Sequence, residues 1–224
     1  MNSQADLEVY LLRSGYENVL WSDLEDYKKH IGSSEFYCQF RSILNSDNEQ
    51  LVSRAIEAVV VLREPSLQQP LVELLRHKEA VIRIEAIEGL VGLEASEELY
   101  RILDLKEDGD YLVRSYVYWA VGILGSLKDV SLLKHALKDE VDATIQSSIV
   151  AAITRLTNDT IYLNRLFEYL KDEDYHVRSL TVNALADLNT AVWQKLIVHK
   201  LRELKQVETT PAVLSSIQRV LSEI

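Results

Sequence analysis

The sequence repeats itself about every 32 residues, and this repetition constrains the fold more than any other feature. The segment 82–93 has counterparts before and after it in which the apolar or small residues keep the same spacing. Counted by the position of Arg83, the six copies lie at 52, 83, 114, 146, 178 and 214, so the spacings are 31, 31, 32, 32 and 36. The apolar positions of each copy share one arc of a 3.6-residue helix, which predicts an amphipathic helix.

A second apolar run precedes each copy, for example Leu71, Leu74 and Leu75 ahead of the helix that holds Arg83. Each unit is therefore predicted to be an antiparallel helix pair, which cannot bury its apolar face alone. We predict an all-α protein whose residues 34–224 form one continuous domain, a superhelical α-solenoid of about six stacked helix pairs. Residues 1–33 do not fit the repeat, and we expect them to be capping helices at the N-terminal end.

Two polar positions recur with the repeat. An acid or amide lies four residues before the arginine position in five copies, where it is predicted to cap the helix: Asn48, Glu79, Asp110, Asp142 and Asp174. The arginine position itself holds Arg83, Arg114 and Arg178. We expect these arginines to form a ladder with acids of their own or the adjacent repeat.

The repeated pattern is Val-Arg-x-x-Ala-x-x-x-Leu-x-x-Leu, with an acid four residues before the arginine. This pattern resembles that of HEAT repeats. It is most similar to the short HEAT-like repeats of phycobilin lyases, over residues 34–224. This resemblance implies stacked helix pairs and, as one function, a chromophore lyase or chaperone subunit with a pigment-sized apolar cleft. No residue of the sequence identifies a bilin site. HEAT-like alkylpurine DNA glycosylases are similar in length, but they need a cationic groove.

Charge and composition exclude several classes of protein. Lys plus Arg is 24 and Asp plus Glu is 35, so the net charge is −11, which argues against nucleic acid as a partner. The longest apolar stretch, 115–127, is too short to span a bilayer, so no membrane is expected. The first residues carry acid where a secretory leader needs positive charge, and the single cysteine, Cys38, permits no internal disulfide. We expect a cytoplasmic protein, and the oligomeric state stays open.

No catalytic constellation stands out in the sequence. The five histidines fall at unrelated repeat positions and form no metal-binding pattern, and glycine-rich phosphate loops and nucleophile elbows are absent. We therefore expect no cofactor, no metal site and no enzymatic activity. An unusual site on one face of a solenoid remains the alternative.

Acidic residues recur at the turns between the two helices of successive units. In a solenoid such turns align along one edge, so the carboxylates are predicted to form a ridge that binds a basic partner. The alternative is that they are helix caps and solvated turn residues. The nominated residues are Asp108, Asp139, Glu140, Asp172 and Glu173.

An aromatic pair marks the outward face of one central helix. Tyr116 and Trp119 point away from the apolar arc, at positions where neighbouring repeats carry Glu57, Glu85 and Glu88. Aromatic residues beside carboxylates on a concave wall are typical of an interface anchor. The alternative is that both rings pack beneath a neighbouring helix.

The function favoured by these features is a non-enzymatic scaffold whose acidic edge and aromatic patch bind a basic protein. One version is an inhibitor or immunity protein that neutralises a basic toxin such as a nuclease. The alternatives are a phycobilin-lyase-like chromophore chaperone and, less favoured because of the negative charge, a HEAT-like DNA glycosylase.

Overall fold

The computed structural model describes residues 1, 3–13, 21–188 and 192–223, so part of the predicted cap, 14–20, lies outside the described residues. The described part is all-α, with fourteen α-helices and three short 3-10 helices, which confirms the predicted fold class. By its internal contacts the chain divides into two compact units, residues 1–107 and 108–224, and each is described by itself. The predicted boundary between residues 33 and 34 stays a prediction.

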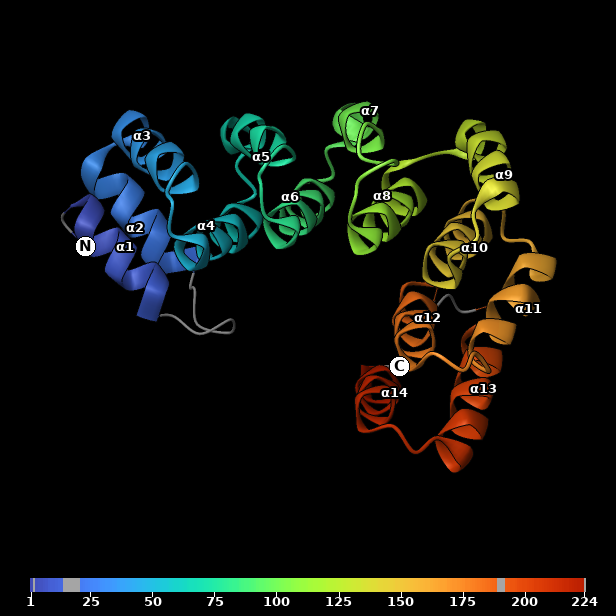
Figure 1. The fold of residues 1–224 in the computed structure, drawn as a ribbon. Coiled ribbons are helices and arrows are strands. Elements are labelled where there is room, and N and C mark those ends of the chain that lie inside the picture. Colours follow the sequence, from blue (N-terminus) through green and yellow to red (C-terminus); the bar gives the residue numbers. More distant parts are fainter. Residues whose placement is uncertain (2, 14–20, 189–191, 224) are drawn as a thin grey trace. The chain divides into compact units, whose positions relative to one another are not determined.

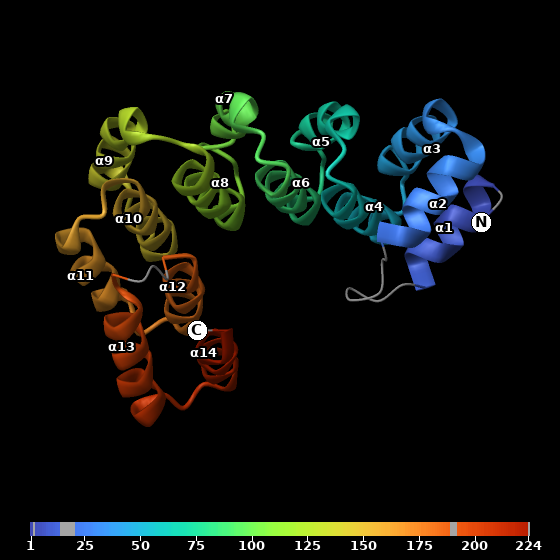
Figure 2. The same ribbon diagram turned by 180° about the vertical axis from the view of Figure 1, so that it is seen from behind.

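The first unit holds seven of the α-helices. In both views of the ribbon, α3, α5 and α7 form one row and α4 and α6 a second row beside it (Figures 1 and 2). The N-terminal helix α1 packs against α4, and α2 packs against both α3 and α4. The helices are α1 (Gln4–Arg13), α2 (Trp21–Ile31), α3 (Ser33–Leu44), α4 (Glu49–Leu62), α5 (Gln68–Leu74), α6 (Ala80–Gly92) and α7 (Leu99–Leu103).

The second unit repeats the same arrangement. One row consists of α8, α10, α12 and α14, and the other of α9, α11 and α13 (Figures 1 and 2). The apolar arc predicted for each repeat is buried between the rows, as at Val117, Ile149 and Leu185. The helices are α8 (Tyr111–Leu124), α9 (Val130–Asp139), α10 (Ala143–Thr157), α11 (Thr160–Tyr169), α12 (Tyr175–Asp187), α13 (Gln194–Val207) and α14 (Pro211–Glu223).

Helices α8 and α10 approach each other closely because the residues between them are small. A Cβ atom added to Gly122 would lie 2.9 Å from the Cα atom of Ala152, inside van der Waals contact. Nearer the start of the same two helices, the hydroxyls of Ser115 and Ser148 share a hydrogen bond of 2.7 Å. This contact places the outward side chains of α8 directly beside those of α10.

The predicted helix caps are confirmed at four of the five positions. The side chains of Asn48, Asp110, Asp142 and Asp174 each accept a hydrogen bond from a backbone N–H of the first helical turn. Glu79 occupies the equivalent position, but its side chain makes no capping bond. A longer glutamate side chain does not fold back onto its own backbone as readily as aspartate or asparagine.

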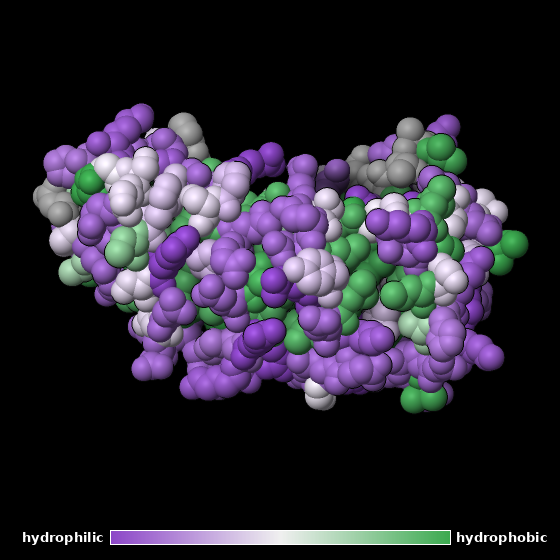
Figure 3. Space-filling model, turned by 90° about the horizontal axis from the view of Figure 1, so that it is seen from above, coloured by the Kyte–Doolittle hydropathy of each residue, from purple (hydrophilic) through white to green (hydrophobic). Residues whose placement is uncertain are grey.

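The face drawn in Figure 3 is mainly hydrophilic. On the face drawn in Figure 3, hydrophobic side chains show between the hydrophilic ones. The exposed hydrophobic residues include Val81, Leu127, Val141, Ile161 and Val207.

Candidate partner-binding site

The acidic turns of the second unit are built by a recurring network. Six residues before the arginine position, one carboxylate oxygen accepts the backbone N–H two residues further on: Asp108 from Asp110 at 2.9 Å and Asp172 from Asp174 at 2.9 Å. Glu140 makes the same contact with Asp142, also at 2.9 Å. Three of the five nominated acids are therefore turn caps, which is the alternative that the sequence left open for them.

The arginine position closes the same turns from the helix side. Arg114 donates to the backbone carbonyl of Asp108 at 2.6 Å, and Arg178 donates to that of Asp172 at 2.8 Å. In the repeat that has glutamine at this position, the Gln146 amide donates to the Glu140 carbonyl at 2.7 Å. Each turn is thus bonded to the helix that follows it.

The predicted ladder of arginines and acids is confirmed at one position. Arg178 holds Glu208 of the next repeat through two bonds, Nε to Oε2 at 2.7 Å and Nη2 to Oε1 at 3.0 Å. These bonds lower the pKa of Glu208 to about 2. Arg83 and Arg114 each donate to a turn carbonyl, that of His77 at 2.9 Å and that of Asp108 at 2.6 Å, and at these two positions the ladder stays a prediction.

The two nominated acids that do not cap a turn are Asp139 and Glu173, and both are exposed. An oxygen of Asp139 lies 3.2 Å from Nδ1 of His135, one helical turn earlier on α9. The backbone carbonyl of Glu173 accepts a bond from Arg178, so its carboxylate is not needed for the turn. These two carboxylates are the members of the predicted ridge best placed to meet a partner.

The aromatic pair lies half-buried on the outward side of α8. The rings of Tyr116 and Trp119 meet edge to face with centroids 5.7 Å apart. The Trp119 indole N–H donates to the Asp187 carboxylate at 2.9 Å, so its side chain extends from α8 across α10 to α12. The pocket beside the indole is lined on α10 by the small side chains of Ser148, Ala151 and Ala152, which leave room for this reach.

Beside the indole lies a small apolar pocket of about 30 Å³, lined by residues of α8, α10 and α12. Arg155 stands at its rim, exposed, and donates from Nη1 to the backbone carbonyl of Asp187. We call Tyr116, Trp119, Arg155 and Asp187 together the aromatic face. Tyrosine, tryptophan and arginine are the residues that most often dominate binding energy at protein interfaces.

Sequence reasoning missed Arg155 and Asp187, although a signal for them existed. The prediction used the outward positions two and five residues after the arginine position, which hold Tyr116 and Trp119 on α8. The position nine residues after lies on the same side of the helix, and it holds Arg155 on α10 and Asp187 on α12.

The nominated acids of the first unit lie on α4 and α6. Glu57 forms an ion pair with Arg54 at 2.9 Å, and Glu88 is exposed. Glu85 is half-buried, and burial raises the pKa of its carboxyl, against a hydrogen bond from Ser53 that lowers it. These residues and the aromatic face belong to different units, so a single patch that combines them stays a prediction.

Part of the chain matches a known protein family. A family model of HEAT repeats matches residues 69–154. These residues are HEAT repeats. The fold is similar to that of a chain in the structure of the complex of CpcE and CpcF of phycocyanin lyase from Nostoc sp. PCC7120. That match covers 100% of this chain and 95% of the other, with a TM-score of 0.60 and 16% sequence identity. No curated protein sequence matches the chain.

The helix pairs outside the matched HEAT repeats have the same architecture, so the fold is a HEAT-repeat solenoid of the kind seen in that lyase complex. Among the residues that the structure describes, no helix is long and apolar enough to cross a membrane. The same residues contain no group of three or more His, Cys, Asp or Glu placed to hold a metal ion.

Proposed function

We propose that the protein is a non-enzymatic HEAT-repeat scaffold of the phycobilin-lyase type, which binds a chromophore. The observation that carries the proposal is the likeness in fold to a chain of the CpcE–CpcF complex over the full length of this chain. A solenoid of this kind offers long rows of helices as binding surfaces and needs no catalytic group for that role.

The aromatic face is the surface of the second unit that suits such a ligand. A bilin is a long conjugated molecule with two carboxylates, so it would stack on Tyr116 and Trp119 and pair with the guanidinium of Arg155. The pocket of about 30 Å³ is far too small to enclose it. The ligand would therefore lie across the outward side of α8, α10 and α12.

Titration of biliverdin, used as a bilin probe, into the protein tests this function. We expect a saturable change in its visible absorption, weakened about tenfold or more in Trp119→Ala, because an interface aromatic ring contributes about 1–2 kcal/mol. Tyr100→Ala is the matched control, since Tyr100 is an exposed aromatic residue of the first unit. An absorption spectrum that does not change at any protein concentration would contradict the proposal.

A second candidate function is the binding of a basic protein, including the neutralisation of a basic toxin. The exposed carboxylates of Asp139 and Glu173 and the net charge of −11 favour it. Like charges along one edge repel each other and attract a cationic partner. Pull-down from a lysate of the source organism at low and high salt tests this function. A basic protein should be retained at low salt and lost from the Asp139→Lys, Glu173→Lys double variant, while Glu107→Lys, which is also exposed, serves as the control.

A further inference from the structure

Two neighbouring helices of this acidic chain carry more cations than acids. Helix α9 contains Lys134 and Lys138 against one acid, Asp139, and α11 contains Arg165 against one acid, Glu168. All three cations are exposed. Their positions on the two helices decide whether they can act together.

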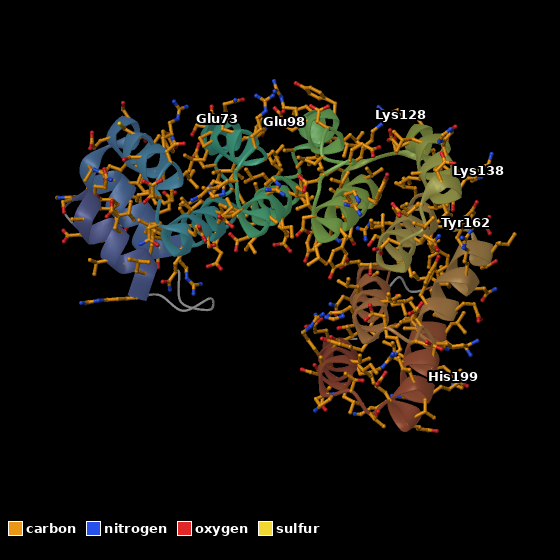
Figure 4. The ribbon with its side chains drawn as sticks, in the orientation of Figure 1. Glu73, Glu98, Lys128, Lys138, Tyr162 and His199 are labelled. Carbon is orange, nitrogen blue, oxygen red and sulfur yellow. The ribbon has the colours of Figure 1, made fainter. Side chains whose placement is uncertain are left out.

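The three cations lie on the sides of α9 and α11 that face each other. The Nζ atom of Lys134 on α9 lies 5.7 Å from the centre of the Tyr162 ring on α11. Lys138 follows Lys134 by four residues and Arg165 follows Tyr162 by three, so each lies on the same side of its helix, one turn further on. Lys138 and Tyr162 are labelled in Figure 4, on neighbouring helices of one row. We call Lys134, Lys138, Tyr162 and Arg165 together the basic patch.

The acids of α9 and α11 are not paired with the basic patch. Glu168 pairs with Lys171 at 2.8 Å, and an oxygen of Asp139 lies 3.2 Å from Nδ1 of His135. Within the part of the chain that the structure describes, none of the three cations of the patch forms an ion pair. Like charges that gather without a counter-charge repel each other, so a bound anion would stabilise the patch.

An exposed aliphatic side chain lies beside the patch. Ile161 is 72% exposed and precedes Arg165 by four residues, so it lies on the same side of α11. Its backbone N–H is held at 2.8 Å by the carboxylate of Asp159, which caps the helix. A ligand that covers Ile161 with an apolar group would recover the free energy that its exposure to water costs.

We propose that the basic patch binds a short acidic segment of a partner protein, in which carboxylates flank an apolar residue. The carboxylates would pair with Lys134, Lys138 and Arg165, and the apolar residue would cover Ile161. Helix α9 has 10 residues and is about 15 Å long, which an extended segment of about five residues spans. The patch lies on the other row of the unit from the aromatic face, and it depends on neither of the functions proposed above.

Nucleic acid and membrane fit the same observations less well. Exposed acids, Asp139 and Glu173, follow the patch at the end of α9 and in the turn after α11. A long phosphate chain that crossed the patch would meet them, whereas a short segment ends before them. A membrane surface requires a broad apolar area beside the cations, and Ile161 supplies a single aliphatic side chain.

Fluorescence anisotropy with a labelled synthetic peptide tests the proposal on the full chain. The peptide has one Leu between two pairs of Glu. We expect saturable binding that weakens with salt, and a loss of about tenfold for Arg165→Gln and for the double variant Lys134→Gln, Lys138→Gln. The matched controls are Arg202→Gln and the double variant Lys195→Gln, Lys205→Gln, which should bind as the wild type does. These cations of α13 are also exposed, and among the described residues they form no ion pair.

The role of Tyr162 has its own pair of variants. Tyr162→Leu should weaken binding because it removes the ring over which Lys134 lies, and Tyr162→Phe should not, because it keeps the ring. Equal weakening by the two variants would mean that the ring does not position Lys134.

Three outcomes would overturn the basic patch as a binding site. The acidic peptide fails to saturate, the variants of the three cations bind it as tightly as the wild type, or a peptide with Lys in place of Glu binds equally well. A single-stranded oligonucleotide and phosphatidylserine vesicles are measured in parallel, and binding to either without binding to the peptide would also overturn the proposal. Circular dichroism of each variant checks the fold, which substitutions of exposed side chains should leave intact.

Discussion

Trp119 and Asp187 are 68 residues apart in the sequence, yet the indole N–H of the one donates to the carboxylate of the other at 2.9 Å. The bond joins α8 to α12 across the small side chains of α10. It holds the indole in one orientation on the aromatic face, which is the condition for a preorganised binding surface.

Removing either partner of this bond tests its contribution to stability. Trp119→Phe keeps an aromatic ring but loses the donor, and Asp187→Ala loses the acceptor. A double-mutant cycle by urea denaturation should give a coupling free energy of about 0.5–1.5 kcal/mol, the usual net value of a hydrogen bond. A coupling indistinguishable from zero would show that the bond does not order the indole in solution.

The close approach of α8 and α10 predicts an unusual response to a glycine substitution. Gly→Ala within a helix is ordinarily stabilising by about 0.5–1 kcal/mol. Gly122→Ala should instead lower the free energy of unfolding by about 1–3 kcal/mol, because the new Cβ meets the backbone of Ala152. Gly109→Ala is the control, since nothing lies within 4 Å of a Cβ there. If Gly122→Ala proves more stable than the wild type, the helices are further apart than described.

The pair of Arg178 and Glu208 predicts a loss of stability in acid. Bonding to Arg178 holds the Glu208 side chain, which is only 3% exposed, at a pKa of about 2 against an ordinary 4.5. Because the folded pKa is the lower one, the contribution is complete above pH 4.5 and is lost as the pH falls toward 2. It amounts to about 3 kcal/mol at neutral pH.

Glu208→Gln should therefore flatten the dependence of unfolding free energy on pH between about 5 and 2. Glu223→Gln is the matched control, since Glu223 pairs with Arg219 on an exposed helix surface. Equal slopes in the wild type and Glu208→Gln would exclude the pair as the source of acid sensitivity.

Capping predicts a contrast between two equivalent positions. Asp142→Ala removes a carboxylate that accepts the N–H of Thr144 at 2.8 Å, so thermal unfolding should show a loss of about 1 kcal/mol. Glu79→Ala, at the same position of an earlier repeat, removes no capping bond and should change stability by less than about 0.5 kcal/mol. Similar losses at the two positions would mean that capping is not what Asp142 contributes.

Glu85 predicts a substitution that stabilises the protein. Its carboxylate is half-buried, one of its oxygens has no hydrogen-bond partner, and its pKa is raised mainly by burial. Because the folded pKa is the higher one, the charged form costs stability once the pH rises above the ordinary value. Glu85→Gln should raise the melting temperature at pH 7 and have a smaller effect at pH 4, whereas Glu88→Gln, on the exposed side of α6, should do neither. A lower melting temperature for Glu85→Gln at pH 7 would refute this account.

The architecture was predictable from sequence because each helix pair buries its apolar arc against its immediate neighbours. That arc appears as a local pattern, and the caps at Asp110 and Asp142 lie within the same short segment. The aromatic face was only half predictable, since the position of Trp119 relative to Asp187 depends on the small residues of α10 that lie between them.

The turns that Arg114, Gln146 and Arg178 close have a consequence for how such a chain can change in length. The acid, the turn backbone and the arginine or glutamine that closes it all belong to one repeat, so a whole unit of about 32 residues can be duplicated or lost with its own turn intact. The hydrogen bond from Trp119 to Asp187 joins two repeats that are separated by a third, so it depends on the number of repeats between them. Insertion or loss of one unit between them would leave the turns closed but bring the indole opposite a different residue. Growth by duplication therefore preserves the fold of such a protein while altering its aromatic face.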